Sequence, residues 1–235
     1  MPNQGLKKVA ILQSSYIPWK GYFNIIKAVD EFVLLDNVQF TRRDWRNRNL
    51  IKTSSGLKWL TIPVAVKGQY LINISEVLTF DNEWRRAHWN QIQQVYQKAN
   101  YFNFYAPVFE RLYLDDDERK LSVINYKFIK QINLLLKIAT PIRWSTEFET
   151  SLEKTERLFQ ICKELQADVY VSGPAAKSYL DVDFFRKNRI DVAWADYSNY
   201  PEYNQPYPPF EHGVSIIDLL FHEGPNAIHF LKDTL

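Results

Sequence analysis

The stretch Lys8-Val9-Ala10-Ile11-Leu12-Gln13-Ser14-Ser15-Tyr16-Ile17-Pro18-Trp19-Lys20-Gly21-Tyr22 contains the signals that decide the fold. Its first five residues are mostly apolar and β-branched, which predicts a buried strand. Pro18 and Gly21 then predict that the strand ends in a loop with a defined backbone conformation. Apolar residues at helical spacing predict a helix over residues 22–29, and a second apolar run predicts a strand over residues 31–36. Strand, helix and strand form a βαβ unit, which builds parallel sheets with right-handed crossovers.

The rest of the chain extends this unit on both sides of a helical middle. Strands are expected over residues 142–145, 168–172 and 191–195, with helices over 155–165 and 182–187. The turn at residues 53–56 predicts a hairpin of residues 50–52 and 57–66, and a further strand is expected at 72–75. An irregular loop over residues 198–210 precedes helices over 214–221 and 225–231. The sequence predicts one α/β domain, residues 1–235, with a parallel, Rossmann-like sheet and a helical insertion at about residues 81–138.

The composition of the chain excludes several classes of function. A net charge of +2 over 235 residues gives no strong field for nucleic acid or for a membrane surface. The single cysteine, Cys162, rules out an internal disulfide and a thiolate metal site. The sequence has no run of about eighteen apolar residues and no apolar segment near its start. We therefore expect a cytoplasmic protein without integral membrane contact.

The loop after the first strand is the first candidate site. Loops that leave the carboxyl ends of parallel strands form the ligand sites of open α/β folds. Gln13 and Tyr16 supply donors and acceptors, and Trp19 and Tyr22 supply flat amphipathic walls. Gly21, at the expected helix start, lets a phosphate approach free backbone N–H groups. The alternative interpretation is that the aromatic residues only pin the loop to the core.

Residues 36–49 form the second candidate site. They contain four Arg and three Asn, and Arg is the side chain suited to bidentate recognition of carboxylate or phosphate. The candidate binding residues are Gln39, Trp45, Asn47, Arg48 and Asn49. A small anionic ligand such as a nucleotide diphosphate fits the weak overall charge better than nucleic acid does. The alternative interpretation is a solvated surface loop.

The third candidate site is Ser172-Gly173-Pro174-Ala175, followed by Tyr179. A strand enters this stretch, and Ser before Pro is a helix-start signal. Free N–H groups at such a start bind anions. The glycine spacing and the Lys-Ser/Thr ending of a phosphate-binding Walker loop are missing. The stretch is therefore predicted to form one end of a pocket.

The sequence offers no self-evident covalent nucleophile. It has no Gly-x-Ser-x-Gly elbow, and Cys162 falls on the apolar face of a predicted helix. It has no His-x-x-x-His pair and no Cys/His group, so no metal is expected. The candidate general bases are Asp36, at the end of a strand, and His88, on a helix. The position of His88 on an apolar face equally suits a buried structural histidine.

These segments together resemble the WbqC-like family. The resemblance rests on Gln13-x-x-Tyr16-x-Pro18-Trp19-x-Gly21-Tyr22-Phe23, Asp36-x-Val38-Gln39-Phe40, Trp45-x-Asn47-Arg48-Asn49, His88 with Tyr96, and Ser172-Gly173-Pro174-Ala175 with Tyr179. It spans nearly the whole chain. Ser14 departs from the pattern, because the family is expected to carry proline there. The family's association with O-antigen and other surface-polysaccharide gene clusters implies a role in making or decorating an activated sugar.

The start of the chain also resembles nucleotidyltransferases of the pantothenate-synthetase type. Their loop holds two histidines separated by two residues, and Trp19 and Tyr22 stand at those places here. The leading hypothesis is a transferase that places an acyl or aminoacyl group on a nucleotide-linked amino sugar, with a small-molecule nucleotide sugar as partner and an acyl donor or ATP as co-substrate. The alternatives are an ATP-dependent activating enzyme and a non-catalytic sugar-nucleotide binding protein. The oligomeric state stays open, with a homodimer as one alternative.

Overall fold

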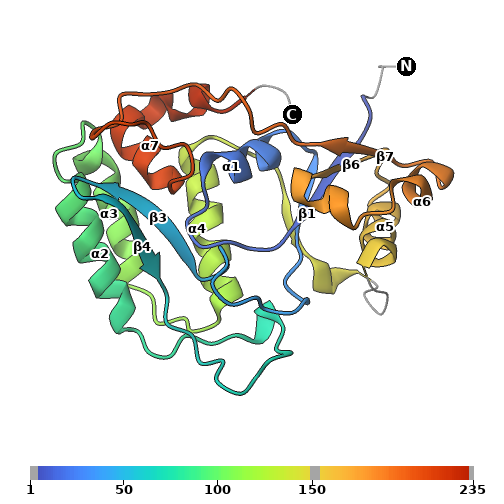
Figure 1. The fold of residues 1–235 in the computed structure, drawn as a ribbon, viewed down its shortest axis with the longest axis horizontal. Coiled ribbons are helices and arrows are strands. Elements are labelled where there is room, and N and C mark those ends of the chain that lie inside the picture. The colour runs from blue at the N-terminus through green and yellow to red at the C-terminus, as the bar shows by residue number, and fades with distance from the viewer. Residues whose placement is uncertain (1–4, 149–153, 233–235) are drawn as a thin grey trace.

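A five-stranded parallel sheet forms the centre of the computed structural model, which describes residues 5–148 and 154–232. Its strands are β1 (Lys8–Leu12), β2 (Glu31–Leu34), β5 (Ile142–Trp144), β6 (Val169–Ser172) and β7 (Asp191–Trp194). Their order is β5-β2-β1-β6-β7, and Figure 1 shows β1 near the middle of the molecule. Later strands are thus added first on one side of β1 and then on the other. The predicted α/β class with a parallel sheet is confirmed.

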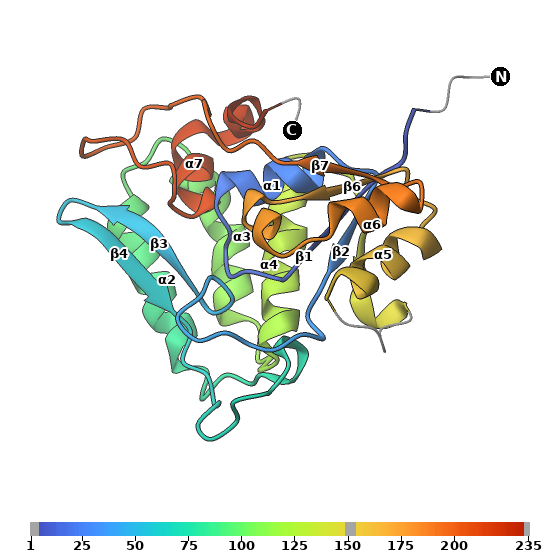
Figure 2. The ribbon, with the colours of Figure 1, turned by 45° about the vertical axis from the view of Figure 1, so that its right-hand side comes forward.

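The helices divide into two groups around this sheet. The first group comprises α1 (Lys20–Lys27), α2 (Glu83–Tyr96), α3 (Phe102–Leu114), α4 (Leu121–Leu135) and α7 (Ile216–Glu223). The second comprises α5 (Lys154–Glu164) and α6 (Val182–Lys187). A separate antiparallel ribbon of β3 (Arg48–Thr53) and β4 (Gly56–Thr61) lies beside α2 in Figures 1 and 2. No helix of residues 5–148 and 154–232 is long and apolar enough to cross a membrane.

Each face of the sheet is covered by its own apolar core. Successive side chains of a strand point to opposite faces. Ala10 and Phe32 accordingly join the core shared with α1, α2, α3, α4 and α7. Val9, Ile11 and Val33 join the core shared with α5 and α6. Both faces are therefore buried, which explains why these strands are continuously apolar in sequence.

Four local predictions differ from the structure. Residues 72–75 do not form a strand: a 3-10 helix runs over Ile74–Glu76, and its start is closed by a capping box between Asn73 and Glu76. The stretch after β6 and the last helical stretch are also 3-10 helices, Pro174–Ser178 and Gly224–Phe230. In the hairpin, β4 ends at Thr61, close before Pro63, whose backbone has no N–H to donate.

Candidate functional site

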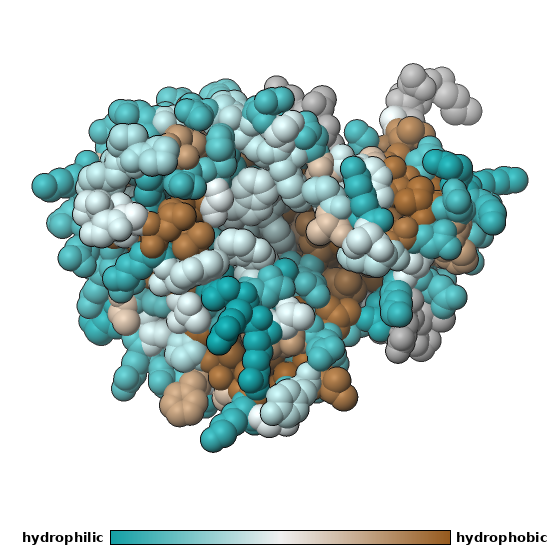
Figure 3. Space-filling model, viewed as in Figure 1, coloured by the Kyte–Doolittle hydropathy of each residue, from teal (hydrophilic) through white to brown (hydrophobic). Residues whose placement is uncertain are grey.

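A cavity of about 520 Å³ lies at the carboxyl ends of β1 and β6, where the strand order reverses. This switch point is where open α/β sheets bind their ligands, because the loops diverge there. Figure 3 shows the face hollowed near its centre, with apolar side chains in the recess. The lining residues come from the ends of both strands, from residues 45–49 and from the C-terminal third: Leu12, Gln13, Ser15, Pro18, Trp19, Tyr22, Trp45, Arg46, Asn49, Ala175, Tyr179, Tyr197 and Gly213. All three sequence-predicted segments thus contribute to one cavity.

The loop after β1 is held in a strained conformation. Ile17 has a φ of 35°, a left-handed value that β-branched residues rarely adopt. Asn49 Nδ2 donates to the carbonyl oxygens of Tyr16 and Ile17, each at 3.0 Å. Ser215 Oγ also donates to the Ile17 carbonyl, at 2.6 Å. Such strain persists only where the surroundings over-determine the backbone, and it concentrates at functional sites.

Two glycines of the predicted sites, Gly21 and Gly173, leave room for aromatic side chains that pack against their backbone. A Cβ on Gly21 would lie 2.2 Å from Trp19 Cζ2, so the Trp19 indole closely covers this glycine. A Cβ on Gly173 would lie 3.1 Å from the Tyr197 hydroxyl. Trp19 and Tyr197 in turn meet edge to face, with ring centroids 5.0 Å apart. The glycines therefore bring cavity walls close together, and the surface over Gly21 is occupied by an indole.

Arg46 brings a positive charge to the cavity, although the sequence reasoning singled out Arg48. Its Nη1 donates to the Ser14 carbonyl at 3.1 Å and to Ser15 Oγ at 3.2 Å, and its Nη2 lies 3.6 Å from Asp44 Oδ1. Over residues 5–148 and 154–232, no Asp, Glu or His lines the cavity beside it. The arrangement favours an anionic ligand group at this wall.

Three further polar side chains line the cavity with their hydrogen-bonding capacity unused. The side chains of Gln13, Tyr179 and Tyr197 make no hydrogen bond to any described residue. Burial raises the pKa of Tyr197 to about 12, so its hydroxyl stays protonated and can donate at neutral pH. A ligand with several hydroxyl or amide groups would satisfy these side chains.

Asp36 lies two residues beyond β2, which ends at Leu34 and not at Asp36 as predicted, and it does not line the cavity. Its side chain is 1% exposed, its Oδ1 accepts from the Ser14 backbone N–H at 2.8 Å, and its Oδ2 has no hydrogen-bond partner. Burial raises its pKa above the usual carboxyl range, although hydrogen bonds from Ser14 partly offset this. The charge of Asp36 raises the pKa of Tyr22, and the charge of Arg46 lowers the pKa of Asp36. Both Tyr22 and Arg46 line the cavity.

His88 also lies outside the cavity, in the core. Its Nδ1 is 2.9 Å from the Tyr16 hydroxyl, which is 2.6 Å from the Tyr113 hydroxyl. Burial lowers the pKa of His88 to about 4, against a smaller opposing effect of a backbone hydrogen bond with Thr61. His88 and Tyr16 are therefore placed in a buried hydrogen-bonded chain rather than at a ligand surface.

The remaining predicted binding residues do not line the cavity and make contacts within the chain instead. Asn47 Nδ2 donates to the Ile62 carbonyl at 2.8 Å, and Gln39 Nε2 donates to the Tyr70 carbonyl at 2.7 Å. Ser172 Oγ is 3.3 Å from the Tyr170 hydroxyl. Arg48 lies over the ring of Trp59. Gly173 and Pro174 link β6 to the wall residue Ala175. The described residues contain no group of three or more His, Cys, Asp or Glu placed to hold a metal ion.

The chain is a Rossmann-like α/β protein with a parallel sheet whose order reverses at β1, and an aromatic cavity lies at that reversal. The chain belongs to the WbqC-like protein family, whose model matches residues 13–230. It is 44% identical over 227 residues to the uncharacterized protein Rv1507c of Mycobacterium tuberculosis, with 97% of this chain and 98% of that protein covered. No solved structure matches the chain.

Proposed function

We propose that this protein is a transferase acting on a nucleotide-linked amino sugar in surface-polysaccharide synthesis, and that it places an acyl or aminoacyl group on the sugar amine. The observation that carries the proposal is the pairing of Arg46 with five aromatic side chains in one cavity at the sheet's switch point. A guanidinium suits a diphosphate, and flat amphipathic rings suit a pyranose or a base.

The unused polar groups of the wall support a sugar as the ligand. Gln13 offers an amide, while Tyr179 and Tyr197 offer hydroxyls, and all three lack partners in the described chain. Sugar hydroxyls and an amino group would pair with them. A cavity of about 520 Å³ falls within the usual range for small-molecule sites, roughly 300–1,000 Å³.

In the proposed reaction the sugar amine attacks the carbonyl carbon of an activated acyl donor. A C–N bond forms, the bond to the donor's leaving group breaks with its electron pair, and the amine loses a proton. We propose Asp36 as the general base that takes up this proton. Its Oδ2 has no hydrogen-bond partner, and its raised pKa makes it more basic than an ordinary carboxylate. Asp36 does not line the cavity, so the proton would have to be relayed to it rather than pass directly from the amine.

A thermal-shift screen with UDP- and dTDP-linked amino sugars, ATP and CoA esters tests the proposal. A ligand at about a hundred times its Kd adds roughly 2.7 kcal/mol of stability, a visible shift. We expect a nucleotide amino sugar to stabilise the wild type and Arg86→Ala, an exposed control, and to stabilise Arg46→Ala far less. Absence of any shift with nucleotide sugars would overturn the proposal.

Turnover is then followed by mass spectrometry of the stabilising sugar with a panel of acyl donors. We expect a mass addition with the wild type, and loss of the addition but retention of binding with Asp36→Asn. A shift with ATP alone, with pyrophosphate release, would favour the ATP-dependent activating enzyme. Binding without turnover would favour the sugar-nucleotide binding protein, which the absence of a carboxylate or histidine from the described lining also suits.

A further inference from the structure

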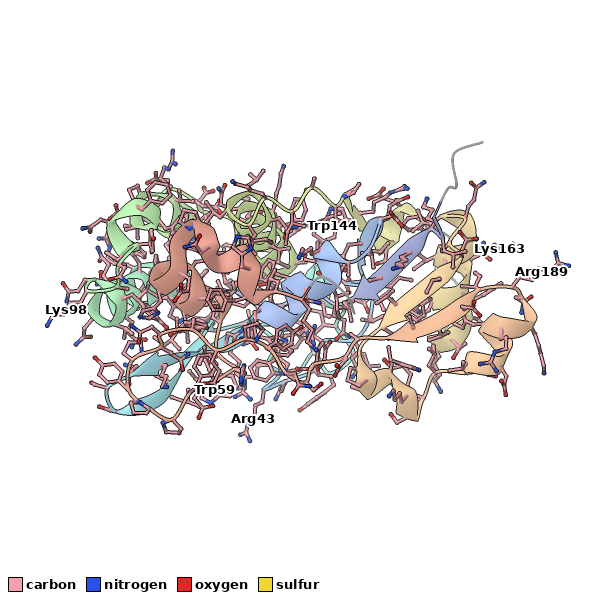
Figure 4. The ribbon with its side chains drawn as sticks, turned by 90° about the horizontal axis from the view of Figure 1, so that it is seen from above. Arg43, Trp59, Lys98, Trp144, Lys163 and Arg189 are labelled. Atoms are coloured by element: carbon pink, nitrogen blue, oxygen red, sulfur yellow. The ribbon has the colours of Figure 1, made fainter. Side chains whose placement is uncertain are left out.

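Two neighbouring indoles are exposed beside the mouth of the cavity. Trp45 is 43% exposed and Trp59 is 40% exposed, and their ring centroids lie 5.4 Å apart at an interplanar angle of 40°. The guanidinium carbon of Arg48 sits 4.0 Å from the centre of the Trp59 ring. We refer to Trp45, Trp59 and Arg48 as the stacking platform. Figure 4 shows Trp59 and Arg43 on the same side of the molecule.

The β3–β4 ribbon fixes this arrangement. Arg48 is paired with Thr61, and Leu50 with Trp59, so Arg48 and Trp59 are diagonal neighbours on one face of the ribbon. The opposite face carries Ile51, which is buried. Backbone pairing thus presents a guanidinium and an indole together on the outer face. Such a geometry does not depend on a flexible loop.

The stacking platform has hydrogen-bonding groups and ring surface that no other described residue occupies. Arg48 forms no ion pair with any carboxylate of residues 5–148 and 154–232; its Nη2 donates to the Arg43 carbonyl, and its buried Nε has no partner. Two large indoles side by side would ordinarily be covered by other residues. Trp45 belongs both to the platform and to the cavity wall, so the two surfaces are continuous.

We propose that the platform binds the nucleobase of the nucleotide-linked ligand. This inference rests on the proposed function and assigns the ends of the substrate: sugar in the cavity, phosphates at Arg46, and base outside on Trp45 and Trp59. A flat base stacks on an indole, and base carbonyl oxygens accept hydrogen bonds from a guanidinium such as that of Arg48. The shared wall, Trp45, places the base next to the phosphates to which it is joined.

Binding of UDP and of N-acetylglucosamine 1-phosphate, measured by calorimetry and by quenching of tryptophan fluorescence, tests the assignment. Stacking on an aromatic side chain is lost when that side chain is replaced by alanine, so Trp59→Ala should weaken UDP binding roughly 5- to 150-fold. Trp59→Phe should recover part of that loss. The sugar phosphate, which lacks a base, should bind Trp59→Ala as it binds the wild type. Phe104→Ala, at a residue 67% exposed on α3, is the control for removing a surface ring.

The outcomes separate the two proposals. If the wild type binds UDP and Trp59→Ala binds it equally well, the platform assignment is wrong and the nucleotide function stands. If Trp59→Ala weakens UDP and the sugar phosphate alike, the platform does not recognise the base, and the assignment is again wrong. If the wild type binds neither UDP nor nucleotide sugars, the proposed function fails and the platform assignment fails with it. A thermal melt of each variant excludes unfolding as the cause.

Discussion

At the residue scale, burial decides what each polar side chain contributes. Tyr16, Tyr113 and His88 form a continuous chain of short contacts, and none of the three lines the cavity. A buried imidazole is favoured in its neutral form, because desolvation penalises the cation. The hydrogen bonds among these three side chains therefore anchor the loop after β1 to α2 and α3, and His88 acts as a hydrogen-bonding core residue.

Acid should test this role of His88. Folding lowers its pKa from 6.5 to about 4, so the unfolded chain takes up the proton first as the pH falls below 6.5. His88 should therefore lose about 3 kcal/mol of its contribution to stability between about pH 7 and about pH 4. His88→Gln has no titrating group, so its deficit relative to the wild type should shrink over that range.

Urea unfolding at several pH values measures the deficit. His229→Gln, at an exposed position, is the control for replacing a histidine. A deficit of His88→Gln that stays constant down to about pH 4 would mean that the folded protein takes up the His88 proton as readily as the unfolded chain, and the lowered pKa would be wrong.

The candidate site was only partly predictable at this scale. Gln13, Trp19 and Tyr22 line the cavity, as the loop motif indicated. The alternation of side chains along a strand could have separated the inward residues of β3 from the outward ones. Because Ile51 is buried, Asn49 and Asn47 point inward as well, and Arg48 points outward. Arg46 precedes β3, where no periodicity applies, so nothing in its neighbourhood distinguished it from the other arginines.

At the scale of elements, the loop after β1 depends on segments far away in the sequence. Ser215, just before α7, donates to the Ile17 carbonyl, and Asn49 of β3 donates to the same atom. Ser215 Oγ also accepts weakly from the Ile217 N–H, at 3.4 Å. One hydroxyl therefore connects the start of α7 with the strained backbone of the cavity loop.

Ser215→Ala should lower stability and ligand affinity together. Loss of a cap and of a buried donor costs about 1–3 kcal/mol. Because Ser215 does not line the cavity, weaker nucleotide-sugar binding would arise from a displaced loop. Ser215→Thr keeps the hydroxyl and should restore affinity, and Ser55→Ala, in an exposed turn, is the control. Unchanged affinity in a destabilised Ser215→Ala would show that the loop holds its shape without this contact.

Element prediction succeeded where the pattern was long and failed where it was short. Strands followed by helices repeat across the chain, and their alternation indicated a parallel sheet. Residues 72–75 are a brief apolar run, and such runs do not distinguish a strand from a turn of helix. The side chains of Asn73 and Glu76 decide in favour of the 3-10 turn by closing its backbone. The bridge between Gln39 and Asn73 could not be read from local pattern, because it joins distant segments.

At the scale of the whole molecule, one sheet carries two cores of different size. The larger core packs α1–α4 and α7 on one face, and the smaller packs α5 and α6 on the other. Figures 1 and 2 show the second group at one end of the molecule. The side chains of β1 point alternately into the two cores. If either core loses its packing, one face of β1 becomes exposed, and the strand that the other core also needs is destabilised. The cavity lies at the carboxyl end of this shared strand, so its geometry depends on both cores.

The chain should therefore unfold in a single transition. Phe128 of α4 is 1% exposed in the larger core, and Phe185 of α6 is fully buried in the smaller one. Replacing either by alanine should cost about 3–5 kcal/mol. If the two cores form one cooperative unit, both variants shift the whole transition by far-UV circular dichroism and by tryptophan fluorescence, and the two probes coincide. If Phe185→Ala instead produces a second, earlier transition while the residues around Phe128 stay folded, the chain contains two folding units, and the prediction of one domain over residues 1–235 fails.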